Sequence, residues 1–259
     1  MPRLPLIATL LLPACVLLKV HEGSGVAAQQ VRDPAPFTAL SSAGDLSVTV
    51  VEGEQPQITV RCDDNLIEDI RTDVDGDTLR IWTESPEGTP VILRNHVPCE
   101  VAVVATGLSA LELSGSGELR ASAPALERLT LSGSGTVRLL GEVVVSQFSA
   151  SISGSGELIA DSLLVDSANL VLSGSGSLEV LSGSADILSL VVSGSGESLL
   201  VPLEAATADV TLTGSGDAAL TATEAVHAVL TGSGALRLHG DPAEREVVAT
   251  GSGDVSFVD

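Results

Sequence analysis

A run of alternating aspartates is the first feature of this chain that could bind a metal ion. Asp73, Asp75 and Asp77 occupy alternate positions, and Glu84 follows eleven residues after Asp73. This spacing approximates the ligand positions of a calcium-binding loop. However, threonine stands where such a loop needs glycine, and no flanking helices are indicated. A β-hairpin turning at the Asp-Gly pair 75–76 explains the same residues. The four carboxylates are therefore weak metal candidates, and we expect no cofactor.

Serine is the most frequently repeated candidate nucleophile. It stands in the middle of eight Gly-Ser-Gly triplets, whereas a nucleophile elbow needs Gly-x-Ser-x-Gly and a histidine partner. His96, His227 and His239 lack the spacing of zinc ligands. The three Phe and one Trp are too few to line the sugar-binding groove of a polysaccharide lyase or hydrolase. We therefore predict that the protein is not an enzyme.

Acidic residues often follow the Gly-Ser-Gly triplets directly. They are Glu118, Glu157, Glu197, Asp217 and Asp254, five of the eight residues at this position. If the triplets stack in space, these carboxylates form a row on one side of the molecule. Such a row could bind divalent cations weakly. We favour the alternative that it is a solvated face that keeps the protein soluble.

The N-terminus has the pattern of an export signal. Arg3 precedes a nearly uniform apolar run, Leu4–Leu18, which has the length of a signal-peptide core and is shorter than the roughly 20 residues of a membrane span. Val26-Ala27-Ala28 fits a cleavage site before Gln29. We therefore predict a signal peptide over residues 1–28 and an exported protein located in the periplasm, on the cell surface or outside the cell.

A second interpretation of the leader is lipidation. Leu12-Pro13-Ala14-Cys15 resembles a lipobox, in which Cys15 would carry a lipid anchor. Pro13 fits this motif poorly, and the apolar run continues past Cys15. This anchor is the only membrane contact that the sequence suggests.

Two cysteines, Cys62 and Cys99, follow the predicted leader. In an oxidising, exported setting two cysteines predict one disulfide with a single connectivity. The alternative is a pair of buried free thiols.

The Gly-Ser-Gly triplets recur every 18 to 21 residues, and a fixed period near 20 is the signature of a solenoid. A tight corner repeated in every coil needs positive φ or close backbone approach, which glycine permits. The predicted corner glycines are Gly115, Gly117, Gly133, Gly135, Gly154, Gly156, Gly174, Gly176, Gly194, Gly196, Gly214, Gly216, Gly232, Gly234, Gly251 and Gly253.

Apolar residues alternate with polar ones on both sides of each triplet, a period of two that indicates strands with one buried face. The residues two before the first glycine, for example, are Leu113, Leu131, Ile152, Leu172, Val192, Leu212, Leu230 and Ala249. We predict an all-β fold, a parallel β-helix with coils of about 20 residues. The rule for crossover connections favours the right-handed form.

The region before the triplets is also β-rich but irregular. Segments 46–50, 57–61 and 97–105 have strand patterns, and 70–74 and 78–82 flank the Asp-Gly turn. We predict an extension over residues 29–36 and initial coils or an N-terminal cap over 37–105. Residues 106–259 form the repeat β-helix, in one continuous domain with 37–105.

Composition excludes further classes. The chain of 259 residues has 34 acidic and 12 basic residues, a formal net charge of −22, which argues against binding to nucleic acid. At 44% hydrophobic residues it is too apolar to be disordered.

The order of these features resembles the bacterial auto-transporter adhesin head domain family, the GIN domain. The matching stretches are 37–40, 60–67 and 74–81, followed by the Leu-Ser-Gly-Ser-Gly units. The resemblance implies an exported β-helical protein and supplies no binding residues. We therefore expect a non-catalytic surface or envelope module, adhesin-like or structural, whose partner is an unidentified protein or glycan. The alternative is a periplasmic interaction module without adhesion. Homo-oligomerisation is left open.

Overall fold

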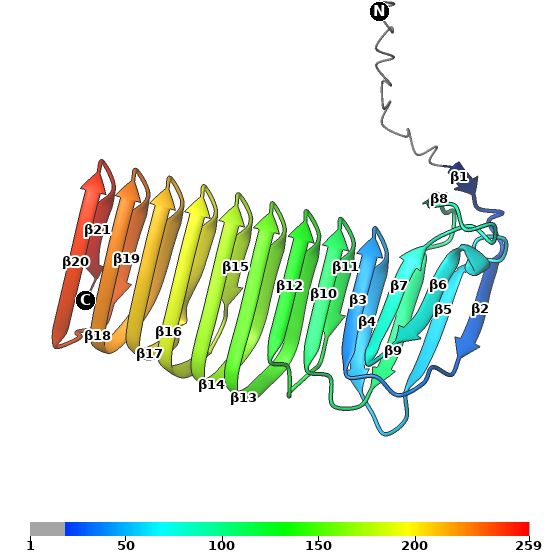
Figure 1. The fold of residues 1–259 in the computed structure, drawn as a ribbon, viewed down its shortest axis with the longest axis horizontal. Coiled ribbons are helices and arrows are strands. Elements are labelled where there is room, and N and C mark those ends of the chain that lie inside the picture. Colours follow the sequence, from blue (N-terminus) through cyan, green and yellow to red (C-terminus); the bar gives the residue numbers. More distant parts are fainter. Residues whose placement is uncertain (1–18, 259) are drawn as a thin grey trace, which may run out of the picture.

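The computed structural model describes residues 19–258 as an all-β, right-handed parallel β-solenoid with a cap at its N-terminal end (Figure 1). The apolar run 4–18, Cys15 and Asp259 lie outside the described residues. Within residues 19–258, no helix combines the length and apolar character that crossing a bilayer requires.

The strands and the 3-10 helix of the described residues are β1 (Lys19–Glu22), β2 (Ala27–Arg32), β3 (Ala39–Gly44), β4 (Ser47–Glu52), β5 (Gln57–Asp63), η1 (Ile67–Asp69), β6 (Ile70–Asp75), β7 (Thr78–Thr83), β8 (Val91–Arg94), β9 (Glu100–Ala105), β10 (Ala110–Gly115), β11 (Glu118–Ala121), β12 (Arg128–Gly133), β13 (Thr136–Gly154), β14 (Glu157–Gly174), β15 (Ser177–Val180), β16 (Gly183–Gly194), β17 (Glu197–Gly214), β18 (Asp217–Gly232), β19 (Ala235–His239), β20 (Glu244–Gly251) and β21 (Asp254–Val258).

Each coil rises along one sheet, turns at its Gly-Ser-Gly triplet and descends along a second sheet (Figure 1). Consecutive coils pair in parallel and in register, so that Leu113 lies opposite Leu131, and Leu131 opposite Ile152. Because side chains alternate between faces, the predicted apolar columns point inward. Leu113, Leu131 and Ile152 are each at most 1% exposed. The core is thus one continuous apolar column between the two sheets.

The first coil of the solenoid, β3 and β4, lies within the region 37–105 that the sequence predicted as initial coils or a cap, and it lacks the triplet. Gly44 pairs with Gly115, and the corner that follows is Asp45-Leu46 instead of Ser-Gly. Ser42, opposite Leu113, points inward, is fully buried, and its hydroxyl has no hydrogen-bond partner. This polar residue in the core column interrupts the apolar alternation of the coil.

Antiparallel strands close the N-terminal end. Parallel stacking continues for one more layer, as β7 pairs with β3 and β9 with β4. Next to these strands, β6 runs antiparallel to β7, β5 antiparallel to β9, and β2 antiparallel to β5. The predicted hairpin is confirmed: β6 and β7 pair across a turn in which Gly76 has a φ of 64°.

Residues 19–28, which the sequence placed in the leader, are part of this cap. Strand β1 pairs in parallel with β8 from Lys19 opposite Val91 to Glu22 opposite Arg94. The first two residues of β2, Ala27 and Ala28, pair with Asp63 and Cys62 of β5.

Candidate binding face

The outer surface of the rising sheet carries two regular rows of small side chains, which we call the hydroxyl face. The first row lies next to the corners and consists of Ser114, Ser132, Ser153, Ser173, Ser193, Thr213, Thr231 and Thr250. The second row lies two residues further from the corners and consists of Glu112, Thr130, Ser151, Val171, Val191, Thr211, Val229 and Val248.

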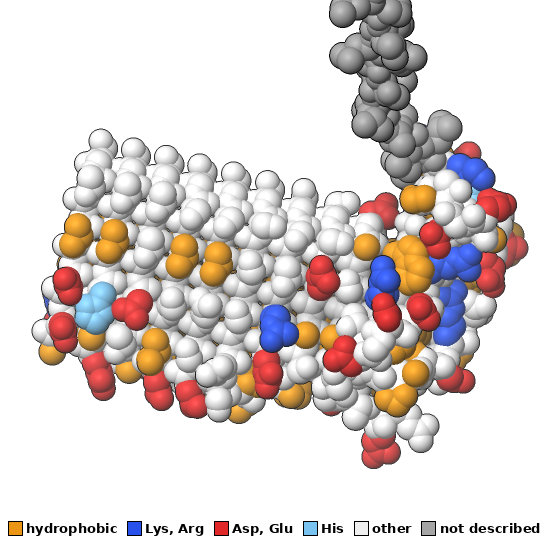
Figure 2. Space-filling model, viewed as in Figure 1, with side chains coloured by type: hydrophobic (Ala, Val, Ile, Leu, Met, Phe, Trp, Pro, Cys, Tyr) orange, Lys and Arg blue, Asp and Glu red, His pale blue; other side chains and the backbone are white. Residues whose placement is uncertain are grey.

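The spacing of these rows follows from strand geometry. Neighbouring coils lie about 4.8 Å apart and the two rows about 7 Å apart. Ser153 Oγ and Ser132 Oγ are 3.5 Å apart, the contact expected of a hydroxyl ladder. Glu112 is the only charged residue of the two rows, and Val229 and Val248 are 47% and 52% exposed. Figure 2 shows a band below the corners with few acidic or basic side chains and a line of apolar ones. The face can therefore form hydrogen bonds and bury methyl groups against a flat partner.

Apart from Glu112, the charged side chains on the outer surface of the rising sheet lie further from the corners than the two rows. His227 Nδ1 lies 2.9 Å from Asp209 Oδ1, and its Nε2 lies 3.7 Å from Glu244. The hydrogen bond with Asp209 raises the pKa of His227, and Glu244 adds to the effect. These groups border the hydroxyl face and leave its two rows uncharged beyond Glu112.

The acidic residues that follow the corners lie on the descending sheet and form the predicted row. Glu118 lies opposite Thr136, which lies opposite Glu157, so neutral residues separate the first acids. Glu197 and Asp217 lie directly opposite each other. Like charges in this position repel. No three of these carboxylates form a metal-binding cluster among residues 19–258.

We predict that the acidic row destabilises the fold at low salt. Replacing Glu197 and Asp217 with serine should raise the denaturation midpoint, because it removes a stacked like-charge pair. Monovalent salt should stabilise the natural protein by screening, and calcium at equal ionic strength should add nothing. Thermal denaturation of both proteins measures this. A calcium-specific rise in melting temperature that disappears in the double variant would instead assign a cation site to the row.

The weak calcium candidates do not come together. Asp73 and Asp75 lie on β6, Asp77 lies in the turn, and Glu84 follows the far end of β7. Asp73 pairs across the hairpin with Arg80. The four residues form no metal-binding cluster in the described part of the chain.

The cysteines do come together in the cap. The structure joins Cys62, on β5, and Cys99, just before β9, in a disulfide with Cα atoms 4.2 Å apart. Asp63 lies beside them, fully buried, and accepts backbone hydrogen bonds from Gly25, His96 and Val97. Burial alone would raise the pKa of Asp63, but these N–H donors prevail and lower it. With its thiols bonded and its carboxylate occupied, this group offers no free metal ligands.

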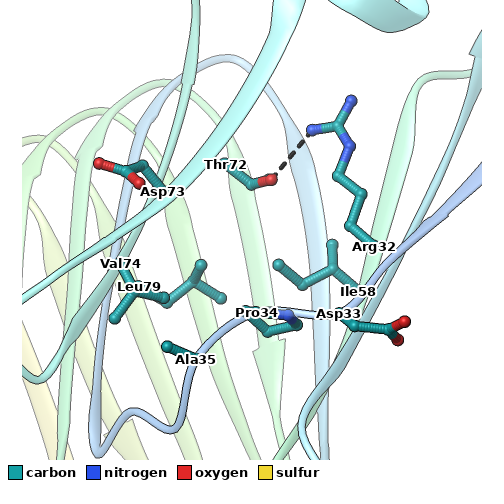
Figure 3. A pocket seen from close by; sticks show the side chains of 9 residues that line it. All are labelled: Arg32, Asp33, Pro34, Ala35, Ile58, Thr72, Asp73, Val74 and Leu79. Atoms are coloured by element: carbon teal, nitrogen blue, oxygen red, sulfur yellow. Dashed lines mark hydrogen bonds between the residues drawn. The ribbon is translucent and has the colours of Figure 1, made fainter.

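A cavity of about 340 Å³ opens at the end of the cap, between β2, β5, β6 and β7 (Figure 3). The Arg32 side chain extends toward Thr72, and apolar residues such as Ile58 and Leu79 also line the cavity. Its guanidinium donates to the carbonyl oxygens of Ile67 and Ile70 and to Thr72 Oγ1. Burial lowers the pKa of Arg32. Because these donors are engaged within the protein, we assign Arg32 to holding the two sheet edges together and not to ligand binding.

A family model described as "Putative auto-transporter adhesin, head GIN domain" matches residues 36–242. The chain belongs to this family. The GIN-domain resemblance drawn from the motifs is thereby confirmed. No match is found among curated proteins.

Solved structures share the fold of this GIN-domain protein. A Parabacteroides distasonis protein described as a "putative lipid binding protein" is 27% identical, with a TM-score of 0.85 over 93% of this chain and 100% of that one. Two proteins described as "putative adhesin", from Parabacteroides merdae and Parabacteroides distasonis, are 20% and 22% identical. Their TM-scores are 0.83 and 0.84, each over 93% of this chain and 100% of theirs. None of these three is described as an enzyme.

Sequence reasoning missed the second row of the hydroxyl face, because its residues share no residue type. It also missed Asp63, whose role depends on backbone groups from residues 25, 96 and 97. Comparing the residues three positions before each triplet could have revealed the second row, since only one of them is charged. The residues next to Asp63 in the sequence give no indication of its hydrogen-bond partners.

Proposed function

We propose that this GIN-domain protein is an exported, non-catalytic module of the cell surface or envelope that binds a protein or glycan partner through its hydroxyl face. One observation carries the proposal. A protein with a net charge of −22 keeps two adjacent in-register rows of one sheet uncharged from the second coil of triplets onward. Family membership and the adhesin descriptions of its structural relatives support the same class of function.

The physical reason is the cost of removing charge from water. A flat partner that covers this face desolvates hydroxyl and methyl groups and no ion, apart from Glu112 at one end. Hydroxyl groups at regular spacing can bond to a partner with repeated polar groups, and exposed valines add apolar contact. The acidic row on the other sheet repels anionic surfaces and leaves the hydroxyl face as the better contact.

The test places one charge on each sheet of the same coil. Ser173 lies on the hydroxyl face and Ser177 on the descending sheet, four residues later. We expect Ser173→Lys to reduce binding at least about tenfold, because the lysine must be desolvated on contact. The matched variant Ser177→Lys should bind like the natural protein.

Binding is measured with purified, labelled protein on intact bacterial cells and on arrays of glycans and envelope proteins. Equal loss in both variants, or no loss in either, would contradict the assignment of the hydroxyl face. Labelling of intact cells with a membrane-impermeant reagent distinguishes the surface module from the periplasmic alternative, since only the former is labelled.

A further inference from the structure

The wall of the solenoid is one strand segment short beside the middle of β13. Strand β12 begins only at Arg128, which pairs with Ser149 of β13. Residues 142–148 of β13 therefore have a strand partner, β14, on one side only, and on the other side they face the loop 122–127. This loop does not continue the sheet, and the outer surface is hollowed beside it.

The hollow, which we call the step pocket, has a volume of about 590 Å³. Sites for small ligands typically measure about 300–1,000 Å³. Most of its lining side chains are polar and come from three consecutive coils: Glu127, Arg128, Gln147, Ser149, Ser167 and Asn169. Strand pairing places Arg128 beside Ser149, and Ser149 beside Asn169. Their side chains therefore share one side of the wall.

Arg128 is the basic group of the step pocket, and its side chain is available to a ligand. Three other arginines of the rod are each held by a carboxylate, in the pairs Arg120–Glu118, Arg138–Asp161 and Arg245–Asp241. Arg128 is exposed and forms no ion pair among residues 19–258. Its guanidinium offers five N–H donors in a fixed plane.

The combination of groups in the pocket suits a neutral ligand that carries several hydroxyl groups. Arg128 can only donate hydrogen bonds, ionised Glu127 can only accept them, and the amides of Gln147 and Asn169 do both. A sugar hydroxyl also donates and accepts. Adjacent hydroxyl groups of one sugar can therefore bond to neighbouring members of this set.

The charge of the pocket argues against an ionic ligand. Glu127 and Arg128 are its only charged lining residues, so their formal charges cancel. A protein with a net charge of −22 repels anions at longer range, and Arg128 repels cations at contact. A neutral ligand meets neither repulsion.

The pocket also lacks the apolar anchor site that peptide recognition commonly uses. Phe148 is its one aromatic lining residue, but it is only 2% exposed and belongs to the core. Val145 is partly buried and packs against the same core. A sugar, which binds through hydroxyl groups, fits these surroundings better than a peptide side chain.

We propose that the step pocket binds a short segment of a neutral glycan, with Arg128, Gln147 and Asn169 bonding to its hydroxyl groups. The pocket adjoins the hydroxyl face, because Thr130 of the second row lies two residues nearer the corner than Arg128. A glycan held in the pocket can thus continue over the two rows. The proposal rests on the proposed function in that the partner meets this side of the rod, and it names that partner as a glycan.

The experiment records ¹H–¹⁵N NMR spectra of the purified full chain while trisaccharides are added. The neutral probes are maltotriose, cellotriose, mannotriose and galactotriose, and trigalacturonate is the anionic counterpart. At least one neutral probe should shift the side-chain amide signals of Gln147 and Asn169, with a Kd on the order of 0.1–5 mM, because each new hydrogen bond replaces one to water. Trigalacturonate should bind at least about tenfold more weakly.

A matched pair of variants assigns the binding to the pocket. Arg128→Gln should weaken it at least about tenfold, because the charged donor is lost. Arg237→Gln removes the same charge from β19, away from the pocket, and should bind like the natural protein. Both arginines are exposed, so both variants should fold. Asn169→Ala, also exposed, should weaken binding without any change of charge.

Three results would overturn the proposal. They are no shift of these signals by any neutral probe at about 20 mM, tighter binding of trigalacturonate, and equal loss in the two arginine variants. Shifts caused by a mixture of short peptides but by no sugar would assign the pocket to a protein partner and would overturn it too.

Failure of this site can be distinguished from failure of the proposed function. If Ser173→Lys lost cell binding while no sugar entered the pocket, the hydroxyl face would stand and the glycan site would fall. Sugar binding in the pocket, with cell binding unchanged in Ser173→Lys, would give the reverse.

Discussion

Replacing Gly174 with valine is expected to destabilise the protein by at least about 3 kcal/mol, the largest effect of any single corner substitution. Gly174 has a φ of 120°, which strains any residue with a Cβ atom and a β-branched one most. A Cβ at this position would also overlap the carbonyl oxygen of Gly154 in the preceding coil. Neither backbone can move away, because both belong to the stacked corners. Equilibrium denaturation in urea measures the loss.

Two alanine variants separate strain from overlap. Gly141 has a φ of 77°, and a Cβ there would meet nothing within 4 Å, so Gly141→Ala isolates the cost of positive φ, about 1–2 kcal/mol. Gly176 is not in the positive-φ region, but its Cβ would overlap the carbonyl oxygen of Gly156. Gly176→Ala therefore isolates close approach between coils.

We expect Gly174→Ala to cost more than Gly141→Ala, since it combines both effects. If Gly174→Val unfolded at the same urea concentration as the natural protein, the corners would not require glycine. The repeat would then need another explanation.

Loss of the Cys62–Cys99 disulfide should give the second-largest effect. The bridge closes a loop with a sequence separation of 37 residues, for which chain entropy predicts about 4 kcal/mol at most. It also ties β5 to β9, whose pairing positions Asp63 beside its backbone donors. We expect Cys62→Ala combined with Cys99→Ala to unfold at clearly lower denaturant concentration than the oxidised protein.

The control for this prediction is the natural protein in reducing agent, which should match the double variant, while reductant should not affect the variant itself. Peptide mapping without reduction should recover Cys62 and Cys99 in one linked species. Two alkylatable thiols in exported protein, or equal stability with and without reductant, would contradict a stabilising bridge.

The repeat part of the fold was predictable because its information is local and repeated. The glycine corners and the alternation around them place each inward residue, from Leu111 in one coil to Val247 in the last. Parallel stacking in register then follows, since only that arrangement buries the same column in every coil. Ser198, like Ser42, is buried in the core without a hydrogen-bond partner and shows that the regular backbone overrides a local mismatch.

The limits of the cap and of the candidate face were decided by tertiary structure. Gly44 could not be recognised as a corner, because its coil departs from the triplet and Ser42 occupies a core position. Residues 19–28 resemble the end of a leader by composition, and only their bonds to Asp63, Asp69 and Arg94 place them in the cap.

Sequence by itself therefore determined the period, the strands, the corner glycines and the acidic row, all of which depend on spacing along the chain. Tertiary structure decided which antiparallel strands close the end of the solenoid. It also decided that the second row lies beside the first row on the hydroxyl face, and that residues 19–28 belong to the cap. The place of residues 19–28 in the cap depends on contacts between residues about 40 or more positions apart, as between Gly25 and Asp63 or His21 and Asp69. A local sequence pattern cannot predict such pairings, because almost any residue type can supply the backbone N–H or C=O group of a hydrogen bond.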